Sequence, residues 1–261
     1  MREIIAFLMK VVYAAGACVY LCTVGFLFSR NRPLISRICV HFGYPRRWRI
    51  PEVDIELVAP DTVSVEIHRT TGIYGNISLL ESVVLARLAK LRNARNIFEI
   101  GTFNGRSTLN LAANSAPDAR VVTLDLPRES ARTTRLPLAP VERMFIEKDM
   151  RIGELFKGTE HERKIVQEYG DSASFDFGPY RNTMDMVFVD GSHSSEYVLN
   201  DSRLALKLLR DGKGLIVWHD YGAEGGWDGV IRVLNRLHAE GGVFSNLMHV
   251  KHTTFVVLTI D

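Results

Sequence analysis

The segment at residues 98–108, FEIGTFNGRST, constrains the fold more than any other part of the chain. Its apolar run ends at Glu99-Ile100, Gly101 and Gly105 bracket a three-residue turn, and a helical pattern begins at Arg106. A strand, a glycine turn and a helix N-terminus in this order are typical of α/β sheets that bind a ligand at the turn. The segment therefore predicts a ligand site where a parallel strand meets a helix.

Strand-like and helix-like segments alternate along the chain after this turn. The residues SLLE at 78–81 have the form of a capping box, and Leu80, Val84, Leu88 and Leu91 form an apolar stripe behind it. Before them, residues 51–67 resemble an extended approach to the domain. Further helices are predicted at 106–115, 196–210 and 227–240, and strands at 96–101, 120–125, 164–169, 184–191 and 214–221.

The last two apolar runs, FSNLMHV and TTFVVLTI, are separated only by Lys251 and His252. This connection is too short for a helical crossover, so the two strands should be antiparallel. The complete pattern predicts an α/β fold with a doubly wound, Rossmann-like, seven-stranded and mostly parallel sheet.

Residues 11–28 form an uncharged apolar segment of 18 residues. As a helix it would be about 27 Å long, which is enough to cross the hydrocarbon core of a bilayer. A bulky and then basic sequence follows it instead of a small-residue cleavage site, so we expect a retained single-pass anchor. More arginines follow the segment than precede it, which places the C-terminal side in the cytoplasm. The alternative is a buried or dimer-forming helix of a soluble protein.

Charge and cysteine content exclude several classes of function. Residues 1–50 carry eight Lys and Arg against one acid, a net charge of +7, so the rest of the chain carries −5 against a total of +2. An acidic body with a basic collar beside an apolar segment does not indicate a nucleic-acid partner. The three cysteines, Cys18, Cys22 and Cys39, show no disulfide framework and suit a reducing compartment. We divide the chain into residues 1–50, an anchor with a basic juxtamembrane segment, and residues 51–261, a ligand-binding domain.

Acidic residues recur where the predicted strands end, and ligands of such sheets bind outside those ends. A dinucleotide would require glycine where Phe103 and Arg106 stand, and no phosphate-binding Gly-Lys-Ser/Thr motif is present. A nucleoside that lacks phosphates and carries a positive charge fits better, and S-adenosyl-L-methionine has both properties. The acids at the strand ends are Glu99, Asp125, Asp171, Asp190 and Asp220.

The motifs FEIGTFNGRST, VVTLDL, GDSASFDF, MDMVFVDGSHSSEYVLND and GLIVWHDY resemble the successive motifs of class I S-adenosylmethionine-dependent methyltransferases. The resemblance covers about residues 70–261 and is nearest to the catechol and macrolide-sugar O-methyltransferase branch. It implies a Rossmann-like methyltransferase fold in which the turn holds the methionine part of the cofactor, Asp125 binds the ribose hydroxyls, and Asp171 and Ser172 contact the adenine. The implied cofactor-binding residues are Glu99, Gly101, Thr102, Phe103, Gly105, Ser107, Asp125, Leu126, Asp171, Ser172 and Asp190.

In metal-dependent members of this family, acids at the ends of the fourth and fifth strands bind Mg²⁺. The corresponding residues here are Asp190, His219 and Asp220. Because His219 replaces an oxygen ligand, which Mg²⁺ prefers, the sequence leaves open whether the metal is Mg²⁺ or another divalent cation. His193 and Asp190 are the candidate catalytic residues, and the alternative is that the histidine is structural and the acids hold loop amides.

The resulting hypothesis is a membrane-anchored, cytoplasm-facing methyltransferase that acts on a hydroxyl of a small-molecule, sugar or lipid-linked acceptor. Residues 126–163 are expected to form a lid or substrate-binding insertion. The alternatives are a metal-independent methyltransferase with a histidine base, and a non-catalytic cofactor-binding scaffold protein at the membrane. The identity of the acceptor and the oligomeric state, including a homo-oligomer, stay open.

Overall fold

The computed structural model describes residues 2–28, 31, 34–35, 38–39, 42, 49–139, 142, 146, 151–222 and 228–261, except for the side chains of residues 2 and 3. The chain divides into two compact units, residues 1–47 with 223–226, and residues 48–222 with 227–261. Most of the basic collar (Arg30, Arg32, Arg37, Arg46 and Arg47) lies outside the described residues.

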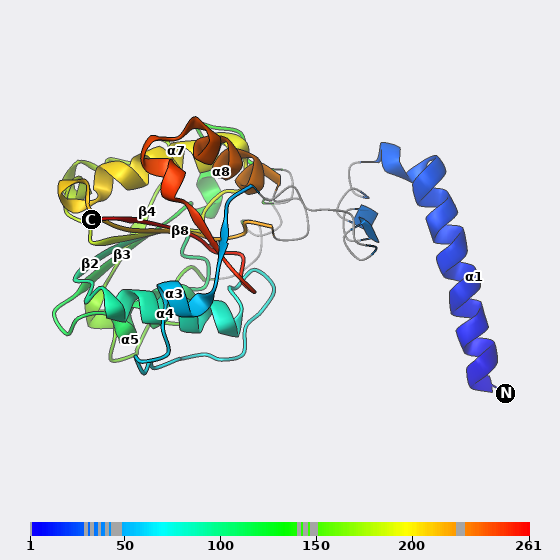
Figure 1. The fold of residues 1–261 in the computed structure, drawn as a ribbon, viewed down its shortest axis with the longest axis horizontal. Helices are drawn as coiled ribbons and strands as arrows, with labels where there is room; N and C mark the ends of the chain where they lie inside the picture. The colour runs from blue at the N-terminus through cyan, green and yellow to red at the C-terminus, as the bar shows by residue number, and fades with distance from the viewer. Residues whose placement is uncertain are drawn as a thin grey trace. The chain divides into compact units, whose positions relative to one another are not determined.

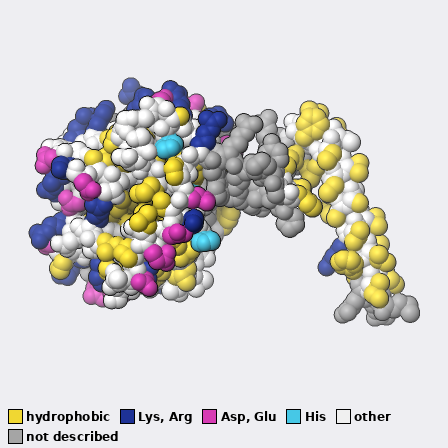
Figure 2. All heavy atoms as spheres, viewed as in Figure 1, with side chains coloured by type: hydrophobic (Ala, Val, Ile, Leu, Met, Phe, Trp, Pro, Cys, Tyr) yellow, Lys and Arg dark blue, Asp and Glu magenta, His cyan; other side chains and the backbone are white. Residues whose placement is uncertain are grey.

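Helix α1 (Arg2–Thr23) dominates the first unit and is followed by a short 3-10 turn, η1 (Gly25–Leu27). The helix ends before residue 28, so the predicted apolar segment is only partly helical. Apolar side chains run along the face of this helix that Figure 2 shows, and nearly all of its described side chains are exposed. Residues Ile4–Thr23 are long and apolar enough to cross a membrane by length and composition alone, criteria that a signal sequence also meets.

The second unit is built around one mixed sheet with the strand order β1-β7-β8-β6-β5-β2-β3-β4 (Figure 1). β8 is antiparallel to both of its neighbours, and the other pairs are parallel, as predicted. The sheet has eight strands instead of the expected seven because β1 adds to the edge beside β7. The strands are β1 (Glu52–Val53), β2 (Asn96–Ile100), β3 (Arg120–Asp125), β4 (Ile165–Tyr169), β5 (Met186–Val189), β6 (Gly214–Trp218), β7 (Met248–Val250) and β8 (Val256–Ile260).

Helices cover both faces of the sheet (Figure 1). Helices α3 (Ile55–Val58), α4 (Leu79–Leu91) and α5 (Arg106–Asn114) lie on one face, and α7 (Ser195–Leu208) and α8 (Asp228–Glu240) lie on the other. Side chains alternate along each strand, so Ile97 and Phe98 of β2 belong to different hydrophobic clusters on opposite faces. Short 3-10 turns complete the domain: η3 (Arg128–Ser130), η4 (Glu162–Lys164), η5 (Gly178–Tyr180), η6 (Arg210–Gly212) and η7 (Gly242–Asn246).

The start of the domain differs from the extended approach expected for residues 51–67. Only β1 pairs with the sheet, and the one-turn helix α3 follows it. The capping box is confirmed, because the Ser78 hydroxyl accepts from the Glu81 amide and the Glu81 carboxylate accepts from the Ser78 amide. The apolar stripe of α4 is only partly buried, since Leu80 and Leu91 are each 40% exposed.

Candidate active site

The glycine turn joins β2 to α5 at the carboxyl end of the sheet. Gly101 has a φ of +100°, and a Cβ there would lie 2.0 Å from the Asp190 carbonyl oxygen. Gly105 precedes α5 with a φ of +83°, and a Cβ there would lie 2.6 Å from the Phe156 ring. Both positions therefore need glycine for conformation and for space. Phe103, between them, also has a positive φ.

Asp125 closes one side of this turn from the end of β3. Its two carboxylate oxygens accept hydrogen bonds from the Phe103 amide at 2.6 Å and from the Leu126 amide at 2.7 Å. Burial raises the pKa of Asp125 to about 6, although these backbone hydrogen bonds oppose the increase. The carboxylate is thus fixed beside the turn, where the family resemblance places the ribose of the cofactor. Its ribose-binding role stays a prediction.

Glu99 lies beneath the turn and is completely buried. One carboxylate oxygen accepts from the hydroxyls of Thr108 and Thr123, and the Thr123 hydroxyl in turn contacts the Thr102 hydroxyl at 2.7 Å. Burial raises the Glu99 pKa to about 7, although hydrogen bonds from Ser107 and the two threonines oppose this. Its second oxygen, Oε1, has no hydrogen-bond partner within the described part of the chain.

Asp171 and Ser172 follow β4, next to α7. The Asp171 carboxylate accepts from the Tyr197 hydroxyl at 2.7 Å, the Ala173 amide at 2.8 Å and the Arg135 amide at 2.7 Å. Burial and the Asp171 carboxylate raise the pKa of Tyr197. These contacts hold the loop in place, and the adenine-binding role of Asp171 and Ser172 stays a prediction.

A cluster of histidines and carboxylates lies at the ends of β5 and β6. The His193 Nε2 is 2.6 Å from Asp220 Oδ2, and the His219 Nδ1 is 2.9 Å from Asp190 Oδ1 and 3.2 Å from Asp220 Oδ2. Asp220 has a φ of +63°, a conformation that costs energy for a residue other than glycine and that concentrates at functional sites. The structure thus brings together all of the predicted catalytic and metal-binding residues.

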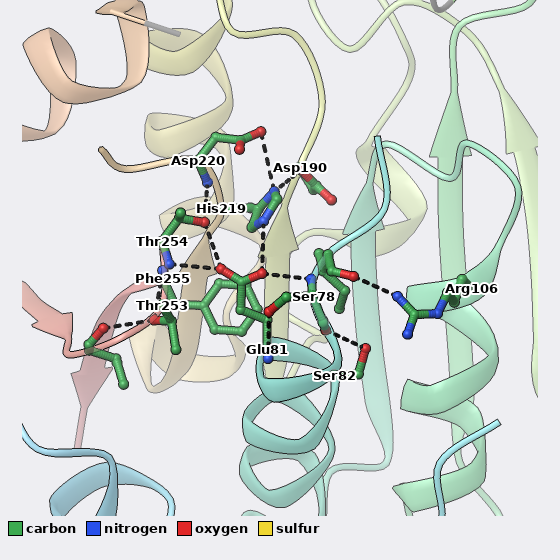
Figure 3. A network of polar contacts seen from close by, with 12 residues as sticks. Ser78, Glu81, Ser82, Arg106, Asp190, His219, Asp220, Thr253, Thr254 and Phe255 are labelled. Atoms are coloured by element: carbon green, nitrogen blue, oxygen red, sulfur yellow. Dashed lines mark hydrogen bonds and ion pairs between the residues drawn. The ribbon is translucent and has the colours of Figure 1, made fainter. Parts of the chain in front are cut away.

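Two further carboxylates extend this cluster and were missed from the sequence. Glu81 of α4 lies 3.6 Å from His219 Nε2, and its other oxygen accepts from the Thr254 amide and hydroxyl (Figure 3). Glu142 accepts from the His193 amide and lies 3.3 Å from His193 Nδ1. Glu81 was visible only as a capping residue, and no pattern around Glu142 indicated a contact with residue 193.

Positive and negative groups alternate through the cluster. Burial alone would lower the pKa of His193, but Asp220 and Glu142 outweigh it and raise the pKa to about 9. In the same way Asp220 and Asp190 hold the pKa of His219 well above its ordinary value. The two histidines hold the pKa of Asp220 well below its ordinary value, although burial acts in the opposite direction. Both histidines are therefore protonated at neutral pH.

The cluster offers ligands for a divalent metal, with one ligand atom each from Asp190, His193 and Asp220 within 4.8 Å of one another. Two carboxylates and one imidazole suit a first-row transition metal better than Mg²⁺, which prefers oxygen ligands. The cationic His219 ring, however, already bridges the two aspartates. Any metal would therefore compete with the protons of both histidines.

Comparison with known proteins shows which proteins this domain is similar to. Residues 98–221 match the family model described as "Methyltransferase domain". The chain is 30% identical over 158 residues to the flavonoid 3',5'-methyltransferase of Vitis vinifera, covering 59% of each protein. It is 32% identical over 161 residues to an Arabidopsis thaliana protein provisionally named a caffeoyl-CoA O-methyltransferase, covering 58% of this chain and 61% of that protein.

Among solved structures, the O-methyltransferase from Bacillus cereus in complex with SAH is 19% identical, with a TM-score of 0.48 over 72% of this chain and 84% of that chain. The matches to the two plant proteins span less than two thirds of either one. They confirm the predicted resemblance: residues 98–221 are similar to a methyltransferase domain, and the two plant relatives are methyltransferases.

The ion pairs of His193 predict a pH-dependent stability. Because the folded-state pKa of about 9 exceeds the ordinary value of 6.5, the stabilisation is complete below pH 6.5 and is lost as the pH rises through about 9. We expect the free energy of unfolding, measured with urea on the full-length protein, to fall across this range. His193→Gln should flatten this part of the profile, whereas His252→Asn, which removes an exposed histidine, should not. Equal slopes for the wild type and His193→Gln would contradict the assignment.

Proposed function

We propose that this protein is an S-adenosylmethionine-dependent methyltransferase that methylates a hydroxyl oxygen of a small-molecule, sugar or lipid-linked acceptor. The observation that carries the proposal is the glycine turn between β2 and α5, with Asp125 held against it from the end of β3. The matched family region, residues 98–221, includes this turn and Asp190, His193, His219 and Asp220 of the histidine–carboxylate cluster. The names of the plant relatives, which refer to flavonoid and caffeoyl-CoA methylation, support an oxygen acceptor.

In the proposed cofactor site, the glycine turn lets the backbone approach the cofactor closely, and the nearby acids bind its hydroxyls and its positive charge. Asp125 would accept both ribose hydroxyls, because each of its oxygens has a lone pair beyond the one used by a backbone amide. Glu99 and Asp190 place acidic side chains near the turn, and a cationic sulfonium bound there would favour their ionised forms where a phosphate would not. The other proposed contacts are Gly101, Thr102, Phe103, Gly105, Ser107, Leu126, Asp171 and Ser172.

Methyl transfer to oxygen is a displacement in line with the carbon–sulfur bond. The acceptor oxygen forms a bond to the methyl carbon, the bond from that carbon to sulfur breaks, and the sulfonium becomes a neutral thioether. The protein must align the three atoms and accept the hydroxyl proton. His193 is the proposed base, with Asp190 beside it. Since the pKa of His193 is about 9, the residue has to lose its own proton before it can accept another.

A divalent metal is the second element of the proposal. Asp190, His193 and Asp220 would hold it, with His219 beside them. When bound, it would lower the pKa of an adjacent hydroxyl. A specific observation favours the metal-independent alternative, because protonated His219 already places a positive charge between Asp190 and Asp220. A cation in that position would stabilise an acceptor oxyanion without a metal.

Membrane attachment through residues 11–28 is the third element. It is supported by the length and composition of α1 and by its exposed apolar side chains. The excess of arginines after this segment in the sequence favours a cytoplasmic catalytic domain.

Loss of the Asp125 carboxylate should weaken cofactor binding. Asp125→Ala removes charged hydrogen bonds to the ribose, which typically contribute about 1.5–3 kcal/mol, so the Kd for S-adenosylmethionine should rise by about 10- to 150-fold in calorimetry. Asp118→Ala is the matched control, since Asp118 is exposed and pairs only with Arg95 among the described contacts. Unchanged affinity in a folded Asp125→Ala protein, or tight binding of NAD by the wild type, would refute the assignment.

Chelation separates the metal-dependent and metal-independent forms of the proposal. If a divalent metal assists the reaction, excess chelator should abolish turnover and leave S-adenosylmethionine binding largely intact, and Asp220→Asn, which removes a candidate ligand outside the proposed cofactor contacts, should do the same. Acceptors would be screened with labelled cofactor, with and without Mg²⁺, Mn²⁺ and Zn²⁺. Full turnover in chelator would exclude the metal and leave His193 and His219 as the groups that handle the acceptor proton.

The anchor is tested by fractionation. The full-length protein should stay in the membrane pellet through carbonate and high-salt washes, because an apolar span is released by detergent and not by ionic strength. A variant with Leu8, Val12 and Val19 of α1 changed to Asp should move to the soluble fraction. Wild-type protein in the soluble fraction without detergent would instead favour the buried or dimer-forming helix.

A further inference from the structure

A second group of metal-ligand side chains lies outside the proposed active site. Glu66, His68 and His161 each offer one ligand atom, and these atoms lie within 4.8 Å of one another. The His68 Nε2 is 2.9 Å from Glu66 Oε1. The rings of His68 and His161 meet edge to face, with their centroids 5.1 Å apart. Two imidazoles and a carboxylate thus converge from segments nearly one hundred residues apart in the sequence.

The backbone around Glu66 and His68 is fixed to helix α5. The amides of Glu66 and His68 donate to the side-chain oxygens of Asn114 and Asn110, at 2.9 and 2.8 Å. The side-chain amides of these asparagines donate back to the carbonyls of Glu66 and His68, at 2.7 and 3.2 Å. Both asparagines are almost completely buried. Glu66 and His68 are two residues apart, and the ion-pair distance between their side chains shows that both lie on the same side of this segment.

The segment that carries His161 is attached to the same helix. Lys164 Nζ donates to the carbonyl of Ala112 at 2.9 Å, near the end of α5. His161 Nε2 is buried and has no hydrogen-bond partner among the residues that the structure describes. An imidazole nitrogen that has no described partner can bind a metal ion.

We propose that Glu66, His68 and His161 form a binding site for a divalent transition metal of the zinc class. Two histidines and one carboxylate leave a fourth position for water, as in three-ligand zinc sites. Ligand atoms around a tetrahedral zinc are about 3.3 Å apart, so separations of up to 4.8 Å require only small side-chain rotations. Mg²⁺ and Ca²⁺ prefer oxygen ligands and fit this donor set poorly.

The position of the site indicates what the metal would do. In the segment that follows His68, the backbone carbonyls of Arg69 and Ile77 accept hydrogen bonds from the Arg106 guanidinium at the start of α5. In the segment that precedes His161, the Gly153 amide donates a hydrogen bond to the Phe103 carbonyl in the glycine turn. The metal would therefore join two segments that both brace the turn. This inference does not depend on the proposed methyltransferase activity, because metal binding is measured without cofactor or acceptor.

The test measures Zn²⁺ binding by full-length, metal-stripped protein in detergent, with a chromogenic chelator as competitor and elemental analysis for stoichiometry. Glu66→Gln, His68→Gln and His161→Gln should each lose one equivalent of tightly bound Zn²⁺. Removal of a direct ligand should weaken the Kd by more than the roughly 10- to 100-fold typical of residues that only orient ligands. Excess Mg²⁺ should not compete, and Zn²⁺ should raise the Tm of the wild type but not of the variants.

Controls separate this site from the cluster at β5 and β6. His193→Gln removes a candidate ligand of that cluster and should still bind the one equivalent of Zn²⁺ that we assign to the site with His161. His252→Asn should bind Zn²⁺ as the wild type does. The Glu66 side chain is 59% exposed, so Glu66→Gln should fold normally even if a histidine variant does not. Equal Zn²⁺ stoichiometry and Kd in the wild type and Glu66→Gln, or loss of all Zn²⁺ in His193→Gln, would overturn the proposal.

Discussion

Close contact between the glycine turn and the end of β5 is the constraint on which the site depends. β2 lies between β3 and β5, so the turn that follows it has the ends of both neighbouring strands beside it. Gly101 approaches the Asp190 carbonyl so closely that no side chain fits, and Asp125 binds the Phe103 amide from the other side. The turn is thereby held in one conformation before any ligand arrives, which lowers the ordering cost of binding.

The buried ionisable groups near this turn are costly, and they are tolerated because each has a partner. Charges removed from water destabilise a protein unless opposite charges and hydrogen bonds compensate. In the cluster at β5 and β6 the compensation comes from alternation of imidazolium and carboxylate groups, with Glu81 and Glu142 at its ends. A neutral pair of histidines would leave Asp190 and Asp220 as two adjacent buried anions. Proton and metal binding are therefore coupled at this site.

Local sequence signals correctly predicted those elements whose formation depends on interactions between neighbouring residues. The capping box at Ser78 and Glu81 predicted the start of α4, and the short connection at Lys251 and His252 predicted an antiparallel pair. Two features were not predictable in this way. β1 is only two residues long, so it has no periodicity of its own and is defined by pairing with β7. Leu80 and Leu91 fit the helical period but are exposed, because the position of the sheet decides which helix face is buried.

The sequence by itself determined the fold class, the glycine turn and the acids at the strand ends, because strand ends and turns are encoded by neighbouring residues. It also placed His193, His219, Asp190 and Asp220 at one edge of the sheet, since parallel strands end together. Only the tertiary structure decided that Glu81 and Glu142 join them, and that Glu66 and His68 meet His161. Those contacts link distant segments, and their geometry follows from how α4, α5 and the loops pack on the sheet, which no local pattern specifies.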